Sequence, residues 1–234
     1  MKAPKKWLIA LTLLPVSAFA TTWGEDIVKD PITGKDCAVQ SPMSSGSYIY
    51  QWPSKYDGVY WPFTDPNWIW FCKDSGYTSF GNDFDALTAD EVKAVAAFLD
   101  QFYVASEGEV NADYKLWLLE STYRLRNTEP GFWGWFKRVK ANIYEEMASS
   151  SRYEAVALLE KEVAQLEPGF DLVQKLYVLG DYYRRFGDPE KAKAMFVKSA
   201  AVEWLDKKGT AQRGSPYINE IIEERLKLME ERQQ

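Results

Sequence analysis

The chain has 234 residues, of which 46% are apolar and 26% charged, a composition typical of a folded globular protein. Twenty-eight Lys and Arg against 34 Asp and Glu give a net charge of −6, which argues against nucleic acid or an anionic membrane as the partner. There is no histidine, which excludes His-based triads and His metal sites. An aromatic content of 15% with 10 Trp predicts either a ring-rich core or a ring-lined binding face.

The first twenty residues have the pattern of a secretory signal peptide. Lys2, Lys5 and Lys6 precede an apolar run over 7–16, and Ala18-Phe19-Ala20 is a small-residue cleavage site. The apolar run is shorter than the roughly 20 residues needed to span a bilayer. We therefore expect cleavage after Ala20, a periplasmic or secreted protein, and no stable membrane insertion. A retained membrane anchor is the alternative.

Cys37 and Cys72 are the only cysteines in the chain. In an oxidising compartment two cysteines most economically form one disulfide. Closing a loop of this length stabilises the fold by roughly 3 to 4 kcal/mol in the chain-entropy model. Two separate buried thiols are the alternative.

The chain changes character near residue 87. Residues 21–87 hold most of the Pro and Gly residues and show no helical periodicity, which predicts an aromatic module of loops and short strands. From residue 88 to 234 the apolar residues recur at steps of three and four, which predicts helices.

Four helices are predicted before residue 168. The first begins with a T-x-x-E capping box at Thr88 and Glu91, and a second box at Ser151 and Glu154 opens the fourth. The second and third are expected over about 112–126 and 132–148. The apolar positions of the first two are Val92, Val95, Leu99 and Phe102, followed by Leu116, Trp117, Leu119 and Tyr123.

The next segment resembles the tetratricopeptide repeat (TPR). The matching positions are Leu176, Leu179, Gly180, Tyr183, Ala192 and Phe196. Gly180 and Ala192 are small where two antiparallel helices must approach closely, and Asp188 is expected to cap the second helix. Residues 132–167 look like a further pair in shape only, and a helix from Pro216 to about residue 232 would cap the stack. The predicted fold is mainly α, a TPR-like stack of helical hairpins with a small N-terminal loop and β ribbon-like module.

Two segments of the N-terminal module resemble the knuckles of a zinc ribbon. They are Asp30-Pro31-Ile32-Thr33-Gly34 and the stretch 71–84, which begins Phe-Cys-Lys-Asp-Ser-Gly-Tyr. The pair is similar to an uncharacterised bacterial family in which C-P-x-C-G knuckles precede TPR-like repeats. The resemblance places the ligand positions at Asp30, Thr33, Cys72 and Ser75, a set that binds zinc poorly. We therefore expect no metal and no cofactor, and hypothesise that a Cys37–Cys72 disulfide has replaced the metal.

Two surfaces are candidates for binding. Among the ten rings of residues 48–71, Trp52, Tyr60 and Trp61 are the best candidates for exposure, and such rings suit a carbohydrate or a cell-wall polymer. The alternative is that these rings form the core. On the TPR-like helix, Lys175, Tyr182 and Arg185 are candidates for a protein-binding concave face, with an ordinary solvated face as the alternative.

No motif for a nucleophile, a phosphate loop or a redox Cys pair is present, so no catalytic residue is expected. The leading hypothesis is an exported, non-enzymatic adaptor that binds another envelope or secreted protein through its TPR-like helices. The alternatives are a carbohydrate or cell-wall binding module and a structural subunit that associates with itself.

Overall fold

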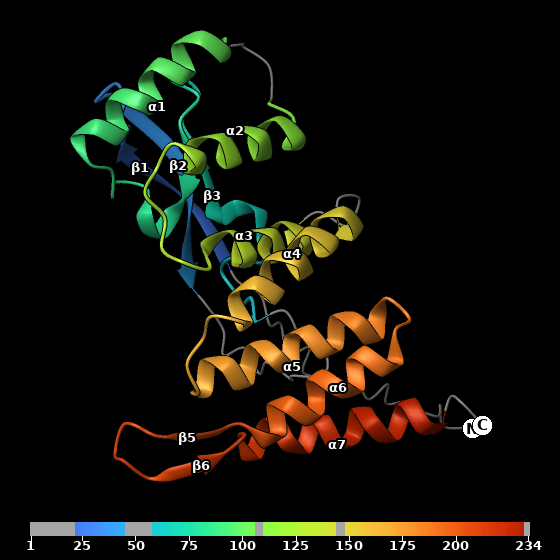
Figure 1. The fold of residues 1–234 in the computed structure, drawn as a ribbon. Helices are drawn as coiled ribbons and strands as arrows, with labels where there is room; N and C mark the ends of the chain where they lie inside the picture. Colours follow the sequence, from blue (N-terminus) through green and yellow to red (C-terminus); the bar gives the residue numbers. More distant parts are fainter. Residues whose placement is uncertain (1–21, 45–57, 106–109, 144–147, 232–234) are drawn as a thin grey trace, which may run out of the picture.

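The structure is a computed structural model that describes residues 22–44, 58–105, 110–143 and 148–231. The predicted signal peptide and Trp52 lie outside the described residues. The described part is mainly α-helical with a small N-terminal β module, as predicted, and its strands form three small two-stranded antiparallel sheets (Figure 1). None of the described helices is long and apolar enough to cross a membrane.

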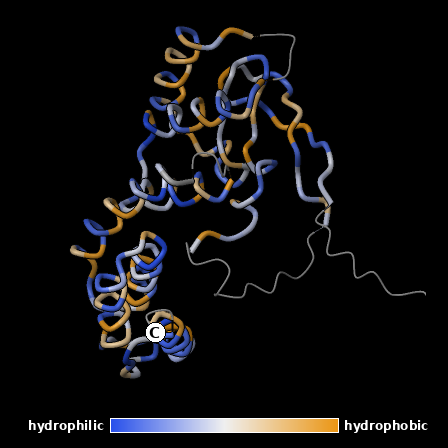
Figure 2. Tube along the Cα trace, turned by 90° about the vertical axis from the view of Figure 1, so that its right-hand side faces the viewer, coloured by the Kyte–Doolittle hydropathy of each residue, from blue (hydrophilic) through white to orange (hydrophobic). Residues whose placement is uncertain are grey.

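The helices run in chain order from the N-terminal module to the last described residues. They are α1 Ala89–Phe102, α2 Ala112–Arg124, α3 Phe132–Ile143, α4 Ala148–Val163, α5 Phe170–Arg185, α6 Pro189–Ala201 and α7 Pro216–Glu231. The strands are β1 Thr22–Lys29, β2 Asp36–Ser44, β3 Ile69–Phe71, β4 Thr78–Phe80, β5 Glu203–Leu205 and β6 Ala211–Arg213. Figures 1 and 2 place β1 to β4 beside α1 and α2 at one end of the molecule and α5 to α7 at the other.

The helix starts follow their local chemistry, with one exception. The capping box at Thr88 is formed, since its Oγ1 accepts from the Glu91 amide and the Glu91 carboxylate accepts from the Thr88 amide at 2.8 Å. Asp188 caps α6. The predicted box at Ser151 is wrong, because α4 already begins at Ala148 and Ser151 is a buried residue inside the helix.

The helices α5 and α6 form a tightly packed hairpin at the predicted close approach. A Cβ on Gly180 would lie 2.6 Å from a ring carbon of Phe196 and 3.2 Å from the Ala192 carbonyl oxygen. Only glycine lets the two helices come this close. Ile218, Ile221 and Ile222 of α7 join the same core, so α7 covers this hairpin as predicted.

The described residues form three hydrophobic cores, and two of these cores contain residues from before and from after residue 87. One joins Cys72 and Tyr77 to Val95 and Leu118, and another joins Ile69 and Phe80 to α2 and α3. The third lies within α4 to α7. Residue 87 therefore marks a change in secondary structure without separating two cores.

The sequence did not indicate the hairpin of β5 and β6, which follows α6 and projects from the end of the helical stack (Figure 1). Its turn is held by Asp206, whose Oδ1 accepts from the amides of Lys208 and Thr210, both at 2.8 Å. Because its strands have three residues each, the hairpin has no alternating pattern long enough to recognise.

Candidate functional site

A tight turn joins β1 to β2 at residues 30–35. The Gly34 amide donates to the Asp30 carbonyl at 2.8 Å, and the Asp30 amide donates to the Lys35 carbonyl at 2.9 Å. The buried Asp30 carboxylate accepts from the Ile32 amide at 2.9 Å and from the Thr33 hydroxyl at 2.6 Å. The side chain of Asp30 is thus used to close its own turn.

The turn at residues 72–77, between β3 and β4, repeats this pattern. The Gly76 amide donates to the Cys72 carbonyl at 2.7 Å, and the Cys72 amide donates to the Tyr77 carbonyl at 2.9 Å. Ser75 Oγ accepts from the Tyr77 amide at 3.0 Å, as Thr33 Oγ1 accepts from the amide two residues later in the first turn. The glycine of each turn has a positive φ, 72° and 80°, which explains the residue choice.

A disulfide between Cys37 and Cys72 joins the two hairpins next to these turns, with a Cα–Cα distance of 5.3 Å. Both cysteines are buried in the core beneath α1. An ion pair between Lys35 and Asp74, at 3.3 Å, also connects the two turns. The cysteine pairing agrees with the sequence prediction.

The four predicted metal-ligand positions do not fit zinc. Asp30 and Thr33 bond to each other, Cys72 is in the disulfide, and Ser75 accepts from a backbone amide. No group of three or more Cys, Asp or Glu side chains in the described parts of the chain could hold a metal ion.

A groove of about 1000 Å³ lies beside the disulfide. Residues of β2, of β3 with the turn that follows it, and of the first turn of α2 line this groove. They include Asp36, Ala38, Gln40, Phe71 and Lys115.

Five rings from α1, α2 and the residue after α1 form a continuous aromatic row next to this groove. Its members are Phe98, Phe102, Tyr103, Tyr114 and Trp117. The Tyr114 ring is nearly parallel to Trp117, with centroids 5.5 Å apart, and to Tyr103 at 6.4 Å. Tyr103 contacts Phe71 in the groove wall, with centroids 6.0 Å apart. The groove and the aromatic row are therefore one continuous surface.

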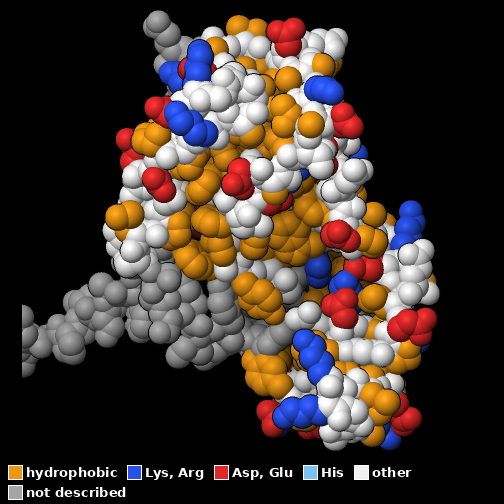
Figure 3. Space-filling model, turned by 90° about the vertical axis from the view of Figure 1, so that its left-hand side faces the viewer, with side chains coloured by type: hydrophobic (Ala, Val, Ile, Leu, Met, Phe, Trp, Pro, Cys, Tyr) orange, Lys and Arg blue, Asp and Glu red, His pale blue; other side chains and the backbone are white. Residues whose placement is uncertain are grey.

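Part of the aromatic row is open to solvent, which corrects a sequence prediction. Phe102 is 49% exposed and Trp117 is 43% exposed, and the neighbouring Val104 is 83% exposed. The apolar periodicity of the sequence placed Phe102 and Trp117 on the helix faces that pack into the core. Trp117 lies outside that face because its neighbours Leu116 and Leu118 are the residues that point into the core. Figure 3 shows a broad hydrophobic area over the N-terminal half of the face in view, with few charged side chains inside it.

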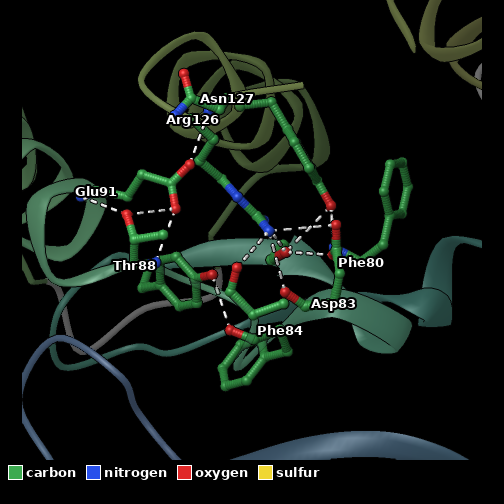
Figure 4. Close-up of polar contacts among 11 residues, drawn as sticks. Phe80, Asp83, Phe84, Thr88, Glu91, Arg126 and Asn127 are labelled. Atoms are coloured by element: carbon green, nitrogen blue, oxygen red, sulfur yellow. Dashed lines mark hydrogen bonds and ion pairs between the residues drawn. The ribbon is translucent and has the colours of Figure 1, made fainter. Parts of the chain in front are cut away.

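The described residues also contain a buried polar network at the end of α2 (Figure 4). Tyr123 Oη donates to Asp83 Oδ1 at 2.6 Å, and Ser79 Oγ donates to the same oxygen at 2.9 Å. Arg126 donates to Ser79 Oγ at 3.1 Å and lies over the Tyr123 ring. Burial, together with the charge of Asp83, raises the pKa of Tyr123.

This network connects the strands to the helices. Ser79 and Tyr123 are fully buried, so no substrate reaches their hydroxyls in this conformation. Glu91 extends the connection, because its Oε1 accepts from the Asn127 amide at 2.7 Å. The arrangement holds α1 and α2 on the N-terminal module.

Of the three predicted helical binding residues, Tyr182 is buried, and Lys175 and Arg185 are half-buried. Tyr182 is only 1% exposed and belongs to the core, which corrects its predicted place on a binding face. Arg185 is bonded to the buried carboxylate of Asp181 at 2.8 Å. Lys175 forms ion pairs with Glu162 and Asp171. These partners come from the same helix or the preceding one, which a single repeat motif does not reveal.

The predicted aromatic candidates are half-buried where they are described. Trp61 contacts Trp23, with ring centroids 6.3 Å apart, and Tyr60 Oη accepts a hydrogen bond from Gln174 of α5 at 3.4 Å. Trp68 ends a 3₁₀ turn over Pro66–Trp68, its ring lies 5.9 Å from that of Trp70 in β3, and Ile69 between them is buried. Rings of this segment also contact rings elsewhere in the protein, as Phe63 does with Phe80 and Trp135.

Comparison of the chain with protein-family models, with curated proteins and with solved structures finds no match. The resemblances to a ribbon family and to TPR repeats stay predictions. The groove and the aromatic row are the features of the structure that bear on function.

Proposed function

We propose that the protein is an exported, non-enzymatic adaptor that binds a partner protein through the groove and the aromatic row of its N-terminal half. The disulfide and the lack of a membrane-spanning helix among the described residues support the exported part of the proposal. The main supporting observation is the exposed aromatic row beside a groove of about 1000 Å³.

Exposed rings suit a protein interface for a physical reason. Trp, Phe and Tyr bury a large area on binding but lose little conformational entropy, and such residues dominate the energy of many interfaces. In the aromatic row, contacts between neighbouring rings already fix their orientations. A partner would therefore meet a preorganised surface.

The helical stack of α4 to α7 plays a supporting part in this proposal. Lys175 and Arg185, which the sequence offered as contact residues, are occupied by ion pairs within the stack. We propose that the stack holds the N-terminal half in place and sets its distance from other parts of an assembly.

The test is photo-crosslinking in the native compartment. A photo-reactive amino acid replaces Val104 beside the aromatic row, or Leu205 in the β5–β6 hairpin as a control of similar exposure at the other end of the molecule. We expect a discrete protein adduct from position 104 and not from position 205. The double variant Phe102→Ala and Trp117→Ala should abolish it, whereas Phe170→Ala, which removes an exposed ring from α5, should not.

Two results would contradict this proposal. One is an adduct that persists in the double variant, because the aromatic row would then be unnecessary. The other is capture of glycan in place of protein, which would favour a carbohydrate-binding module.

A further inference from the structure

We infer that the outer edge of β2 inside the groove binds an extended segment of the partner protein as an additional β-strand, with an acidic residue of that segment placed at Lys115. This inference depends on the proposed function, because it names the part of the partner that the groove accepts.

A single side-chain bond shows which way the backbone of β2 points. The indole nitrogen of Trp70 donates to the Gln40 carbonyl at 2.8 Å, so this carbonyl faces away from β1. In an antiparallel pair both backbone groups of a residue point to the same side, and the side alternates along the strand. The amide and carbonyl groups of Asp36 and Ala38 therefore also point away from β1.

Two further observations agree with this assignment. Ala38 lies opposite Ile27, and the Ile27 amide bonds to the Asp26 carboxylate at 2.8 Å instead of pairing across the ladder. The backbone groups of Pro42, like those of Ala38, point away from β1. Proline fits this position because it has no amide hydrogen to donate to the β1–β2 ladder.

The outward groups at the centre of β2 form an unpaired strand edge. Among the described strands β2 pairs only with β1, so the outward backbone groups of Asp36 and Ala38 and the outward amide of Gln40 have no partner strand. These three residues line the groove. An open row of alternating donors and acceptors pairs readily with another extended chain.

A residue of β3 lines the same groove. The Cys72 amide bonds toward β4, so the backbone groups of Phe71, one residue earlier, point away from β4. An extended segment bonded to the edge of β2 would therefore lie beside Phe71. The span from Asp36 to Gln40 matches a strand of about four or five residues.

One cation of the groove favours an acidic residue in the segment. The groove lining holds four carboxylates, those of Glu25, Asp30, Asp36 and Asp74. Asp36 is paired with Lys29, Asp74 is paired with Lys35, and Asp30 is buried in its own turn. Lys115, on the first turn of α2, forms no ion pair with a described residue, and its ammonium lies 5.5 Å from the centre of the Phe71 ring. A carboxylate of the partner segment would pair with this cation.

Hydrogen exchange of the purified protein, followed by NMR, tests the open edge first. We expect the amides of Ala38 and Gln40 to exchange at least about tenfold faster than those of Cys37 and Val39, which belong to the β1 ladder. Equal protection of all four amides would show that the edge is already covered and would overturn the inference.

Peptides selected from a random phage-displayed library against the purified protein then test the ligand. We expect enriched peptides to be extended and to carry an Asp or Glu at the position that reaches Lys115. Ala38→Pro removes one outward amide and should weaken their binding by about tenfold or more, the loss expected for a backbone hydrogen bond with added steric conflict. Ala38→Ser keeps the amide and should bind within about twofold of the wild type. Circular dichroism and an intact disulfide establish that the proline variant folds.

Equal peptide binding by the Ala38→Pro and Ala38→Ser variants would overturn the inference, as would failure to enrich any peptide. Self-association that Ala38→Pro abolishes would replace the partner segment with a second copy of the chain. If Ala38→Pro keeps the crosslink from position 104 while the aromatic variants lose it, the strand inference fails and the proposed function stands. If no variant changes the crosslink, the proposed function fails as well.

Discussion

At the scale of single residues, Tyr123 shows how a buried polar group can organise a fold. Its hydroxyl bonds to Asp83, Ser79 and the Phe80 amide, and its ring lies in the core with Phe80 and Phe136. Removing the hydroxyl would leave several buried partners unsatisfied.

We predict that Tyr123→Phe lowers the free energy of unfolding by about 1 to 3 kcal/mol, the cost of leaving buried polar groups unpaired. Urea denaturation measures this change. Tyr153→Phe is the matched control, because Tyr153 is 62% exposed and its hydroxyl should contribute less than about 0.5 kcal/mol. Equal stability of both variants would show that the network is dispensable.

The Glu120 carboxylate forms an ionic link between α2 and α3. It accepts from Lys137 and Lys140 of α3, both at 3.0 Å, and from Arg124 of its own helix at 2.6 Å. Burial alone would raise the pKa of Glu120, but these three cationic donors lower it to about 2. Lys137 also bonds to Glu154, which connects α4 to the same group.

Because the folded-state pKa of Glu120 lies below its unfolded value, this residue stabilises the fold above the unfolded pKa. The contribution is lost as pH falls from about 5 toward about 2. We predict that the wild type is more stable than Glu120→Gln by up to about 3 kcal/mol at pH 7, and that the gap narrows over this range. Denaturation at several pH values measures the gap, and a constant gap would contradict the assignment.

At the scale of elements, the α5–α6 hairpin depends on the lack of a side chain at Gly180. We predict that Gly180→Ala lowers the free energy of unfolding by about 1 to 3 kcal/mol through overpacking, despite the better helix propensity of alanine. Gly169→Ala is a suitable control, because its new Cβ would meet no atom closer than 3.8 Å. Thermal denaturation of both variants compares them, and a stabilised Gly180→Ala would show that the helices can separate at little cost.

At the scale of the whole molecule, the cores shared across residue 87 make the two halves interdependent. Val95, Leu99 and Leu118 pack against the disulfide and the second turn, and Phe136 and Val139 pack against Phe80. The helices α4 to α7 have a core of their own.

We therefore predict that a fragment of residues 88–234 keeps α4 to α7 folded while α1 to α3 lose their protection. Hydrogen exchange followed by mass spectrometry would show rapid exchange over residues 89–143 and slow exchange over 170–201. Full protection of 89–143 in the fragment would mean that the helical half folds without the N-terminal module.

Local patterns in the sequence determined much of this protein. The capping box at Thr88, the close contact at Gly180 and the pairing of the two cysteines each follow from the chemistry of a few residues, and each is present in the structure. The mainly helical fold follows from apolar periodicity, which a helix imposes on its own sequence.

Only the tertiary structure decided where the open surfaces lie. Periodicity could not show that Trp117 is exposed, that Tyr182 is buried or that the outer edge of β2 borders a groove. Exposure depends on which elements pack together, and those contacts join residues far apart in the chain. Strand edges and ion pairs likewise involve partners that no local pattern specifies, so the candidate site becomes visible only in the folded molecule.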